Sequence, residues 1–241
     1  MKRAIVTGAS GGIGRAVAER LMEAGWTVGL VARRRELLEE VAEGRDAVVL
    51  PCDVTSPEDV EAAFASFGEG GAPLDFLFNN AGIFTPAAPI DEVSVENWNK
   101  AVAVNLTGMF LCARAAFGQM RHQSPQGGRI VNNGSVSADR PREGSVTYTA
   151  TKHGVTGLTK SLSLDGRPFD IAAGQIDIGN AETEMVATLK ARELEAGREV
   201  PPTMEVRHVA DAVLAMAELP LSANVLFQTI MATKMPLIGR G

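Results

Sequence analysis

Thr7-Gly8-Ala9-Ser10-Gly11-Gly12-Ile13-Gly14 is the stretch that decides the fold, because it closes the apolar run Arg3–Thr7 and opens the helical pattern Gly12–Ala24. Any sharp strand-to-helix turn can use glycine, which lets the backbone turn tightly. At the start of a helix, however, the free N–H groups and the positive end of the dipole favour a bound phosphate. The stretch therefore predicts a phosphate-binding turn formed by Gly8, Ser10, Gly11, Gly12, Ile13 and Gly14.

Short β-rich runs alternate with longer helical patterns along nearly the whole chain. This alternation indicates βαβ units with right-handed connections and a parallel sheet covered on both faces. The sequence thus predicts a single doubly wound, Rossmann-like α/β domain over residues 1–241, with a seven-stranded parallel sheet. The expected strands are Arg3–Thr7, Thr27–Ala32, Ala47–Leu50, Leu74–Phe78, Arg129–Asn132, Ile171–Asp177 and Asn224–Ile230. The expected helices are Gly12–Ala24, Pro57–Phe67, Val95–Arg121, Tyr148–Leu164 and Glu205–Glu218.

Composition and charge narrow the possible partners. The chain of 241 residues is 45% hydrophobic and 22% charged, which is typical of a soluble globular protein. Its formal net charge of −6 argues against nucleic acid or anionic lipid as the main partner. No apolar run suggests a membrane span, and the first residues lack the apolar stretch of a signal peptide. We therefore expect a cytoplasmic protein that binds neither nucleic acid nor membrane.

The cysteines and histidines do not suggest a metal site. Cys52 and Cys112 form no CxxC pair and are interpreted as small apolar fillers in a reducing compartment. His122, His153 and His208 have no ligand spacing to each other or to the cysteines. We expect no metal ion.

The residues that end the second predicted strand, Val31-Ala32-Arg33-Arg34, indicate which dinucleotide binds. Proteins that bind NAD usually place an acidic residue there for the ribose hydroxyls, and this chain has none. Ala32 leaves room, while Arg33, with Arg34 beside it, would hold a 2′-phosphate through a planar, charge-assisted fork. Alternatively, the arginines merely begin a solvated helix, where their charge would oppose the helix dipole. We expect NADP(H) as the cofactor.

Tyr148 is the only tyrosine in the chain, and Lys152 follows it four residues later. On a helix these two positions share a face, so the phenol and the ammonium group would reach the same ligand. A carbonyl that accepts hydride needs an acid to protonate its oxygen, and the reverse reaction needs a base. Because a cation favours phenolate, Lys152 is expected to lower the pKa of Tyr148 from about 10 toward the working range.

These features resemble the short-chain dehydrogenase/reductase family over nearly the whole chain. The glycines at positions 8, 12 and 14 match the family's TGxxxGxG motif, and Asn79-Asn80-Ala81-Gly82 matches its NNAG motif. Ser135 stands as far before Tyr148 as the family's serine stands before its tyrosine, since 148 − 135 = 13. Asn105, in Val104–Gly108, matches the family's helix asparagine. A small residue followed by arginine after the second strand is the family's pattern for NADP.

The resemblance implies a role for each matched residue. Ser135 would hydrogen-bond the carbonyl oxygen, and Asn105 would support a proton relay through water and lysine. Lys152 would also hold the nicotinamide ribose. The implied catalytic residues are Asn105, Ser135, Tyr148 and Lys152. Of the other cofactor contacts, Asp53 and Val54 would lie against the adenine, and Asn80, Ala81 and Gly82 beside the ribose.

The segment after the sixth strand departs from the family's N-P-G-x-V-x-T pattern. The chain reads Asp177-Ile178-Gly179-Asn180-Ala181-Glu182-Thr183, so that Ile178 replaces the proline. Gly179, Ala181 and Thr183 would still contact the nicotinamide carboxamide. Losing the proline is expected to loosen the loop.

Two further segments leave alternatives open. The charged segment 183–203 is either a mobile lid over the substrate or a solvated surface helix. Arg140 and Arg142 lie between Ser135 and Tyr148, where they would either bind a carboxylate substrate or form a solvated charge cluster, and we favour the cluster.

The sequence predicts an NADP-dependent oxidoreductase that transfers hydride between nicotinamide and a small-molecule carbonyl or alcohol. The alternative is an NADPH-binding sensor or interaction protein without turnover. The presence of Ser135, Tyr148 and Lys152 favours the enzyme. The resemblance also implies a homodimer or homotetramer, but the substrate is not identified, because the same scaffold serves many substrates.

Overall fold

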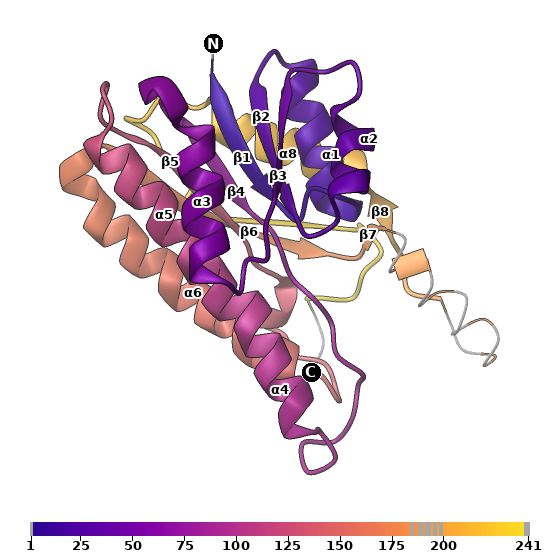
Figure 1. Cartoon of the computed structure of the whole chain (residues 1–241). Helices are drawn as coiled ribbons and strands as arrows, with labels where there is room; N and C mark the ends of the chain where they lie inside the picture. The colour runs from indigo at the N-terminus through magenta and orange to yellow at the C-terminus, as the bar shows by residue number, and fades with distance from the viewer. Residues whose placement is uncertain are drawn as a thin grey trace.

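Seven parallel strands form the central sheet of the molecule, in the order β3-β2-β1-β4-β5-β6-β9 (Figure 1). The computed structural model describes residues 2–183, 186–187, 190, 194, 197 and 200–238. Within them, the predicted seven-stranded parallel sheet of a Rossmann-like fold is confirmed. Its strands are β1 (Arg3–Thr7), β2 (Thr27–Ala32), β3 (Ala47–Pro51), β4 (Phe76–Asn79), β5 (Gly128–Asn133), β6 (Ile171–Gly179) and β9 (Phe227–Met231).

The strand order reverses at β1, which pairs with β2 on one side and with β4 on the other. Thr7 at the end of β1 is in register with Val31 of β2, and Val6 with Phe78 of β4. The loops that leave β1 and β4 therefore diverge from this point. In open α/β sheets a ligand binds in the crevice outside the carboxyl ends of the strands at such a reversal.

Helices cover both faces of the sheet (Figure 1). On one face lie α1 (Gly12–Glu23), α2 (Arg35–Ala42) and α8 (Val206–Glu218), and on the other lie α3 (Pro57–Phe67), α5 (Met109–His122) and α6 (Val146–Gly166). Val17, Leu21 and Val213 pack on the first face, and Phe64 and Met120 on the second. A fully buried side chain of this size contributes about 1.5–3 kcal/mol to stability. The core therefore lies in two layers, one on each side of the strands.

The long helix predicted at Val95–Arg121 is interrupted by a wider turn. The structure has α4 (Val95–Val102), a π-helical turn η2 (Ala103–Gly108), and then α5. Turns of this kind inside α-helices are frequently found at functional sites. Here the wide turn carries Asn105, whose side chain bonds to a neighbouring loop.

The helical stretch Val95–His122, which comprises α4, η2 and α5, is long and apolar enough to cross a membrane by length and composition, with a mean hydropathy of 1.4 in its most apolar window. The expectation that no run suggests such a span was therefore wrong by this measure. The structure gives another reason for the apolar content, since Met109, Cys112 and Met120 of α5 are buried. α5 also contacts β4 and β5 of the sheet.

Several element boundaries differ from the sequence prediction. The amphipathic helix α2 was not among the predicted helices. β4 begins at Phe76, two residues later than expected, and the backbone of Leu74 before it bonds to the side chain of Gln123. The remaining elements are η1 (Glu69–Gly71), η3 (Val136–Ala138), η4 (Arg167–Phe169), β7 (Ala181–Glu182) and β8 (Met204–Glu205).

Most of the charged segment 183–203 lies outside the described residues. The two chain segments that flank it pair with each other, since β7 and β8 form a short parallel ladder. Asn180 also donates to the carbonyl oxygen of Pro202 at 3.1 Å. The lid expected in this segment stays a prediction.

Arg129 of β5 holds the end of α8 against the sheet. Its side chain is 1% exposed and donates to the carbonyl oxygens of Leu219, Pro220 and Ala223 and to Oδ1 of Asn224. These four bonds engage both terminal nitrogens of the buried guanidinium, while its Nε has no partner among the described residues. They also tie the loop before β9 to the middle of the sheet.

Replacing Arg129 with Met should lower the free energy of unfolding by about 2–4 kcal/mol, because the carbonyl oxygens around it lose their donor. Chemical denaturation measures this change. Arg114→Met is the matched control, since the Arg114 side chain is 61% exposed and, among the described residues, pairs with Glu61 alone. It should shift the same quantity by less than about 0.5 kcal/mol. Equal losses in the two variants would contradict the structural role of Arg129.

Candidate active site

The predicted phosphate-binding turn joins β1 to α1 at the carboxyl edge of the sheet. Gly8 has a φ of +69°, a conformation that side chains rarely adopt. A Cβ atom on Gly14 would lie 2.2 Å from the carbonyl oxygen of Gly8, so only glycine allows this approach. The first turn of α1 has neither a side-chain cap nor an acidic residue. Its first N–H groups therefore face no competing carboxylate, and the turn fits a bound diphosphate.

The two arginines after β2 lie on the same edge and are exposed. Arg34 is the residue that precedes α2. Within the described parts of the chain, neither Arg33 nor Arg34 forms an ion pair. The pKa of Asp53 is lowered chiefly by the hydrogen bond from the N–H of Thr55, and the charge of Arg33 lowers it further. Arg33 is therefore a neighbour of Asp53, the predicted adenine contact. The positive charges of Arg33 and Arg34 are therefore suited to binding a phosphate group.

The NNAG stretch after β4 is fixed to the end of β1 by Thr7. The Thr7 hydroxyl oxygen accepts from the N–H groups of Asn80 at 2.8 Å and Ala81 at 3.0 Å. Asn80 in turn donates through Nδ2 to the carbonyl oxygen of Thr7 at 2.9 Å. The two loops at the strand reversal therefore keep a fixed spacing. Val54, from the loop after β3, is buried, and its side chain lies against Gly108 of the π-helical turn.

Asn105 connects the π-helical turn to the loop after β4. Its side chain is fully buried, with Oδ1 accepting from the N–H of Ile83 at 2.7 Å and Nδ2 donating to the carbonyl oxygen of Ile83 at 2.9 Å. Nδ2 also lies 3.4 Å from the hydroxyl of Thr151, next to Lys152. A Cβ on Gly82 would lie 3.4 Å from Oδ1. The helix asparagine thus has its polar partners, while its part in a proton relay stays a prediction.

Ser135, Tyr148 and Lys152 are brought together where β5 ends and α6 begins. Ser135 is 5% exposed, and its hydroxyl lies near enough to the Tyr148 phenol to lower the pKa of that group. Lys152 is 2% exposed, and its Nζ donates to the carbonyl oxygen of Asn133 at 2.7 Å. The same Nζ atom lies 5.5 Å from the centre of the Tyr148 ring. A hydroxyl, a phenol and an ammonium group thus share one small, mostly dry volume.

The pKa of Tyr148 differs from the sequence expectation. Burial raises it above its ordinary value, opposed by the hydrogen bond from Ser135 and by the charge of Arg142. Lys152 does not produce the expected lowering, because its Nζ bonds to the Asn133 carbonyl rather than to the phenol. Burial also lowers the pKa of Lys152 from 10.5 to about 8. The buried surroundings therefore favour the neutral form of both groups.

Two neighbours of Tyr148 are Phe84, which the sequence did not single out, and Arg142, which the sequence assigned to a solvated charge cluster in preference to a substrate contact. The Phe84 ring stacks on the Tyr148 ring, with centroids 4.3 Å apart and an interplanar angle of 25°. The hydroxyls of Thr85 and Thr147 lie 2.7 Å apart and join the same two segments. Nothing in the sequence pattern indicated Phe84. Of the two loop arginines, Arg140 pairs with the adjacent Asp139, whereas the charge of Arg142 acts on Tyr148.

The segment after β6 is more regular than the loss of proline suggested. β6 continues through Ile178 and Gly179, which pair with Ile230 and Met231 of β9. The expected loosening was wrong here, because isoleucine has the backbone N–H that proline lacks and can remain in a strand. Ala181 follows in β7 and is buried.

Thr183 meets the glycine turn from the opposite side. Its Cγ2 atom would lie 3.4 Å from a Cβ on Gly12. The structure therefore brings the first and the last of the predicted cofactor contacts together.

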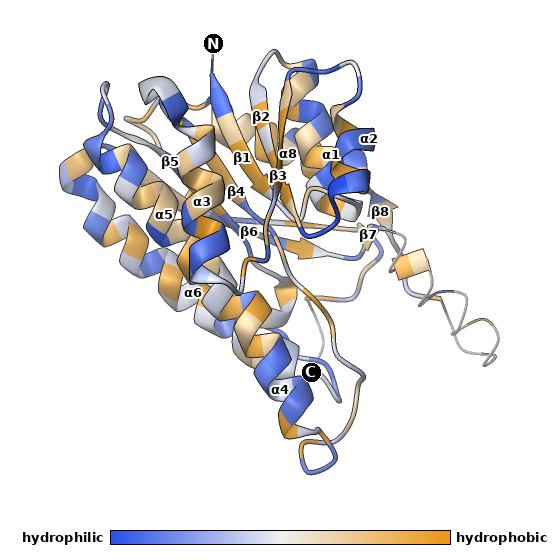
Figure 2. Cartoon of the chain, viewed as in Figure 1, coloured by the Kyte–Doolittle hydropathy of each residue, from blue (hydrophilic) through white to orange (hydrophobic). Residues whose placement is uncertain are grey.

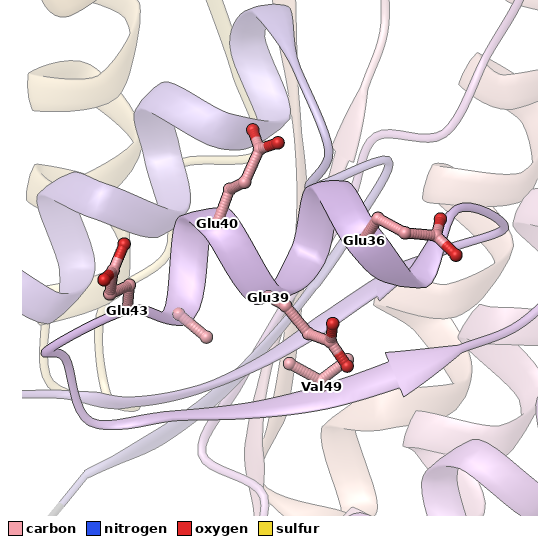
Figure 3. A pocket seen from close by; sticks show the side chains of 6 residues that line it. Glu36, Glu39, Glu40, Glu43 and Val49 are labelled. Atoms are coloured by element: carbon pink, nitrogen blue, oxygen red, sulfur yellow. The ribbon is translucent and has the colours of Figure 1, made fainter.

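Other features are separate from this site. A hollow of about 510 Å³ between α2 and β3 shares no residue with it and is lined by carboxylates that would repel a nucleotide (Figure 3). Its lining residues are Glu36, Glu39, Glu40, Ala42, Glu43 and Val49.

Cys52 and Cys112 are buried free thiols, and burial raises the pKa of Cys52 to about 12, so both behave as apolar fillers. No cluster of three metal-binding side chains occurs in the described residues.

Comparison with known proteins identifies relatives along most of the chain. Residues 2–194 match the profile of the short chain dehydrogenase family. The chain is 34% identical over 212 residues to a 3beta-hydroxysteroid dehydrogenase of Mediterraneibacter gnavus, covering 83% of this chain and 75% of that one. It is 32% identical over 235 residues to a 3-oxoacyl-[acyl-carrier-protein] reductase of Vibrio harveyi, covering 95% and 94%.

Two solved structures share the fold. A 3-ketoacyl-(acyl-carrier-protein) reductase of Brucella melitensis complexed with NADH has a TM-score of 0.85 and 27% identity, with 95% of this chain and 96% of that one covered. An actinorhodin polyketide ketoreductase variant with NADPH has a TM-score of 0.85 and 30% identity, with 96% of each chain covered. Both nucleotides are therefore represented among the structural neighbours.

The buried lysine gives a pH-dependent prediction. Because the pKa of Lys152 falls from 10.5 to about 8 on folding, the unfolded chain binds more protons between these pH values. Lys152 thus destabilises the nucleotide-free protein fully below pH 8, and the cost disappears as pH rises toward 10.5. Lys152→Met should raise the free energy of unfolding at pH 7 by about 1–3 kcal/mol, and by less at pH 9.5.

Chemical denaturation at these two pH values measures the difference. Lys160→Met is the control, since Lys160 is exposed on the same helix, and it should change stability by less than about 0.5 kcal/mol at either pH. A Lys152→Met protein that is less stable than the wild type at pH 7 would contradict the destabilising burial of this ammonium group.

Proposed function

Because the chain belongs to the short-chain dehydrogenase family of oxidoreductases, we propose that it uses NADP(H) to interconvert a carbonyl and an alcohol, with Tyr148 as the proton donor and acceptor. The observation that carries the proposal is the cluster of buried Ser135 and Lys152 around the half-buried Tyr148. It lies at the same edge of the sheet as the glycine turn. One edge thus holds both the proton-transfer groups and a fitted anion site.

The cofactor part of the proposal rests on two anion sites. The turn at Gly8–Gly14 would hold the diphosphate on the first N–H groups of α1. Arg33 and Arg34 would hold a 2′-phosphate, which NADP(H) carries and NAD(H) lacks. Asn80, Ala81 and Gly82 would lie beside the ribose, and Gly179, Ala181 and Thr183 beside the nicotinamide. When bound, NADP(H) supplies or accepts the hydride.

The residues of the cluster divide the proton work. Tyr148 gives its phenolic proton to the substrate oxygen in reduction and takes it back in oxidation. Ser135 holds that oxygen with its hydroxyl and stabilises the charge that develops on it. Lys152 returns a proton toward the phenol and, through Asn105 and water, would draw one from solvent. The raised pKa of Tyr148 is suited to the role of acid, because the phenol is protonated at neutral pH.

The wall beside Tyr148 is expected to meet the substrate. Phe84 offers an exposed aromatic ring next to the phenol, and Arg142 places a positive charge near it. The similar proteins are named for substrates as different as a hydroxysteroid and an oxoacyl chain. The proposal is therefore limited to small-molecule carbonyls and alcohols.

The proposal includes a homodimer or homotetramer. Hydrophobic residues, coloured orange in Figure 2, recur along α5 and α6, and some of them are exposed. Phe110 of α5 is 48% exposed and Leu164 of α6 is 59% exposed, while Val95 at the start of α4 is 74% exposed. Apolar surface of this kind marks an interface when it is contiguous. The cytoplasmic location stays a prediction from the sequence.

Tyr148→Phe should reduce turnover at least about 10³-fold, because the ring is kept while the acid and base are lost. The measurement is NADPH oxidation followed by absorbance over a panel of ketones and aldehydes. NADPH affinity, measured by calorimetry, should stay close to that of the wild type. Turnover close to that of the wild type in this variant would contradict the role of Tyr148 as proton donor and acceptor.

If the wild type binds NADPH tightly and turns over no carbonyl on a broad panel, the non-catalytic sensor becomes the better account.

Arg33→Ala should weaken NADPH binding at least about tenfold and leave NADH binding nearly unchanged, since only NADPH presents a 2′-phosphate. Calorimetric titration with each nucleotide measures both affinities. Arg35→Ala is the matched control, because Arg35 is also exposed but pairs with Glu39 on α2. An equal loss of affinity for the two nucleotides in Arg33→Ala would refute the phosphate role.

A further inference from the structure

Asp177 is a half-buried carboxylate beside Ser135 that the proposed chemistry does not use. It lies on β6, next to the end of β5. Its Oδ1 atom accepts from the N–H of Ser135 at 2.8 Å and from Nε2 of Gln175 at 2.7 Å. An acidic side chain at this depth needs such partners to stay ionised. The role of this carboxylate next to the proton-transfer cluster therefore needs an explanation.

Gly134 shows that the backbone is fitted to this carboxylate. A Cβ on Gly134 would lie 2.1 Å from Oδ1 of Asp177 and 2.6 Å from Nε2 of Gln175. Any other residue at 134 would displace one of these two side chains. The glycine between Asn133 and Ser135 thus leaves space for the carboxylate that binds Ser135.

Lys152 and Asp177 hold opposite ends of the same tripeptide. Nζ of Lys152 donates to the carbonyl oxygen of Asn133, and Asp177 accepts the N–H of Ser135. The two groups carry opposite charges, and each favours the ionised form of the other. Asn133–Ser135 is therefore clamped between a buried cation and a nearby anion.

The carboxylate is itself aligned by the helix that carries Tyr148. Gln175 is 1% exposed, and its Nε2 also donates to the hydroxyl of Thr156 at 3.1 Å. Its Oε1 accepts from the hydroxyl of Thr159 at 3.1 Å. Both threonines belong to α6, so α6 and β6 jointly determine where the Asp177 carboxylate points.

We infer that Asp177 is a positioning residue of this site, which holds the backbone of Ser135 through one carboxylate oxygen and places a negative charge near the buried ammonium group of Lys152. The inference rests on the proposed function, since it assigns Asp177 a part in the same proton-transfer cluster. Asp177 touches neither the phenol nor the glycine turn. It acts through its bond to the Ser135 backbone and through its negative charge, which is felt by Lys152 and Tyr148.

The charged groups around Asp177 set the sign of its effect. From α6 it faces Lys152 and Tyr148, and from the loop after η3 it faces Asp139, whose negative charge opposes its ionisation. The negative charge of Asp177 raises the pKa of both Lys152 and Tyr148. Removing that charge makes proton loss from both groups easier, so both pKa values fall.

Tyr148 can be titrated directly because it is the only tyrosine in the chain. Ultraviolet difference absorbance of the phenolate then reports its pKa without any substrate or cofactor. Asp177→Asn keeps an oxygen for the N–H of Ser135 and removes only the charge. We expect the phenolate midpoint to fall by about one pH unit. Circular dichroism at each pH shows that the titrated protein is folded.

Asp139→Asn is the matched control, since it removes the same charge from a side chain that is 83% exposed. Its midpoint should stay within about 0.2 pH unit of the wild type, because solvent screens an exposed charge. A midpoint in Asp177→Asn that equals that of the wild type, or that lies above it, would overturn the inference. Since no turnover is needed, this result is independent of whether the protein reduces a carbonyl.

A second variant separates charge from position. Asp177→Ala removes both the charge and the acceptor of the Ser135 N–H. It should lower the phenolate midpoint as Asp177→Asn does. Its kcat for the best carbonyl of the panel should also be about tenfold lower than the kcat of Asp177→Asn. KM for NADPH should not change in either variant.

If alkali unfolds the protein before the phenolate appears, the pH profile of kcat/KM for alcohol oxidation replaces the titration. Its rising limb must then move to lower pH in both variants, and an unmoved limb counts against Asp177.

Discussion

Every polar group that is buried beneath the carboxyl edge of the sheet has to find a hydrogen-bond partner there, and this constraint organises the molecule. Asn79, Asn132, Thr159 and Gln175 are at most 1% exposed. Nδ2 of Asn79 lies 3.2 Å from Oδ1 of Asn132, whose own Nδ2 donates to Thr159 at 2.9 Å, and Thr159 reaches Gln175. An unsatisfied group in such a row would cost about 1–3 kcal/mol. The row therefore fixes the position of α6 against β4, β5 and β6.

The chemistry of the site depends on that fixed helix. Tyr148 and Lys152 lie at the end of α6 that reaches the carboxyl edge, and Ser135 lies at the end of β5. They are aligned by the row below, by the contact of Lys152 with Asn133 and by the bond of the Ser135 N–H to Asp177. The same edge carries the glycine turn and the exposed Arg33. An anion site and a proton-transfer cluster therefore lie side by side at the ends of regular helices and strands.

Much of this arrangement could be predicted from the sequence, because it depends on local patterns. Apolar runs and glycine turns gave the parallel sheet, and the spacing of Ser135, Tyr148 and Lys152 gave the cluster. Features that depend on contacts between distant segments were not predictable. The π-helical turn carries the bonds of Asn105 to Ile83, and the raised pKa of Tyr148 follows chiefly from burial, with Nζ of Lys152 bonded to Asn133 instead of the phenol. Phe84 shows no sequence pattern, since only the folded loop places it on Tyr148.

The central claim is that the carboxyl edge of this sheet is an NADP(H) site built around Tyr148. Calorimetric titration of the wild-type protein with NADPH and with NADH tests it most directly. The account predicts tight binding of NADPH, with NADH at least about tenfold weaker, because Arg33 and Arg34 have a phosphate to bind only in the first case. Failure to bind either nucleotide would contradict the account.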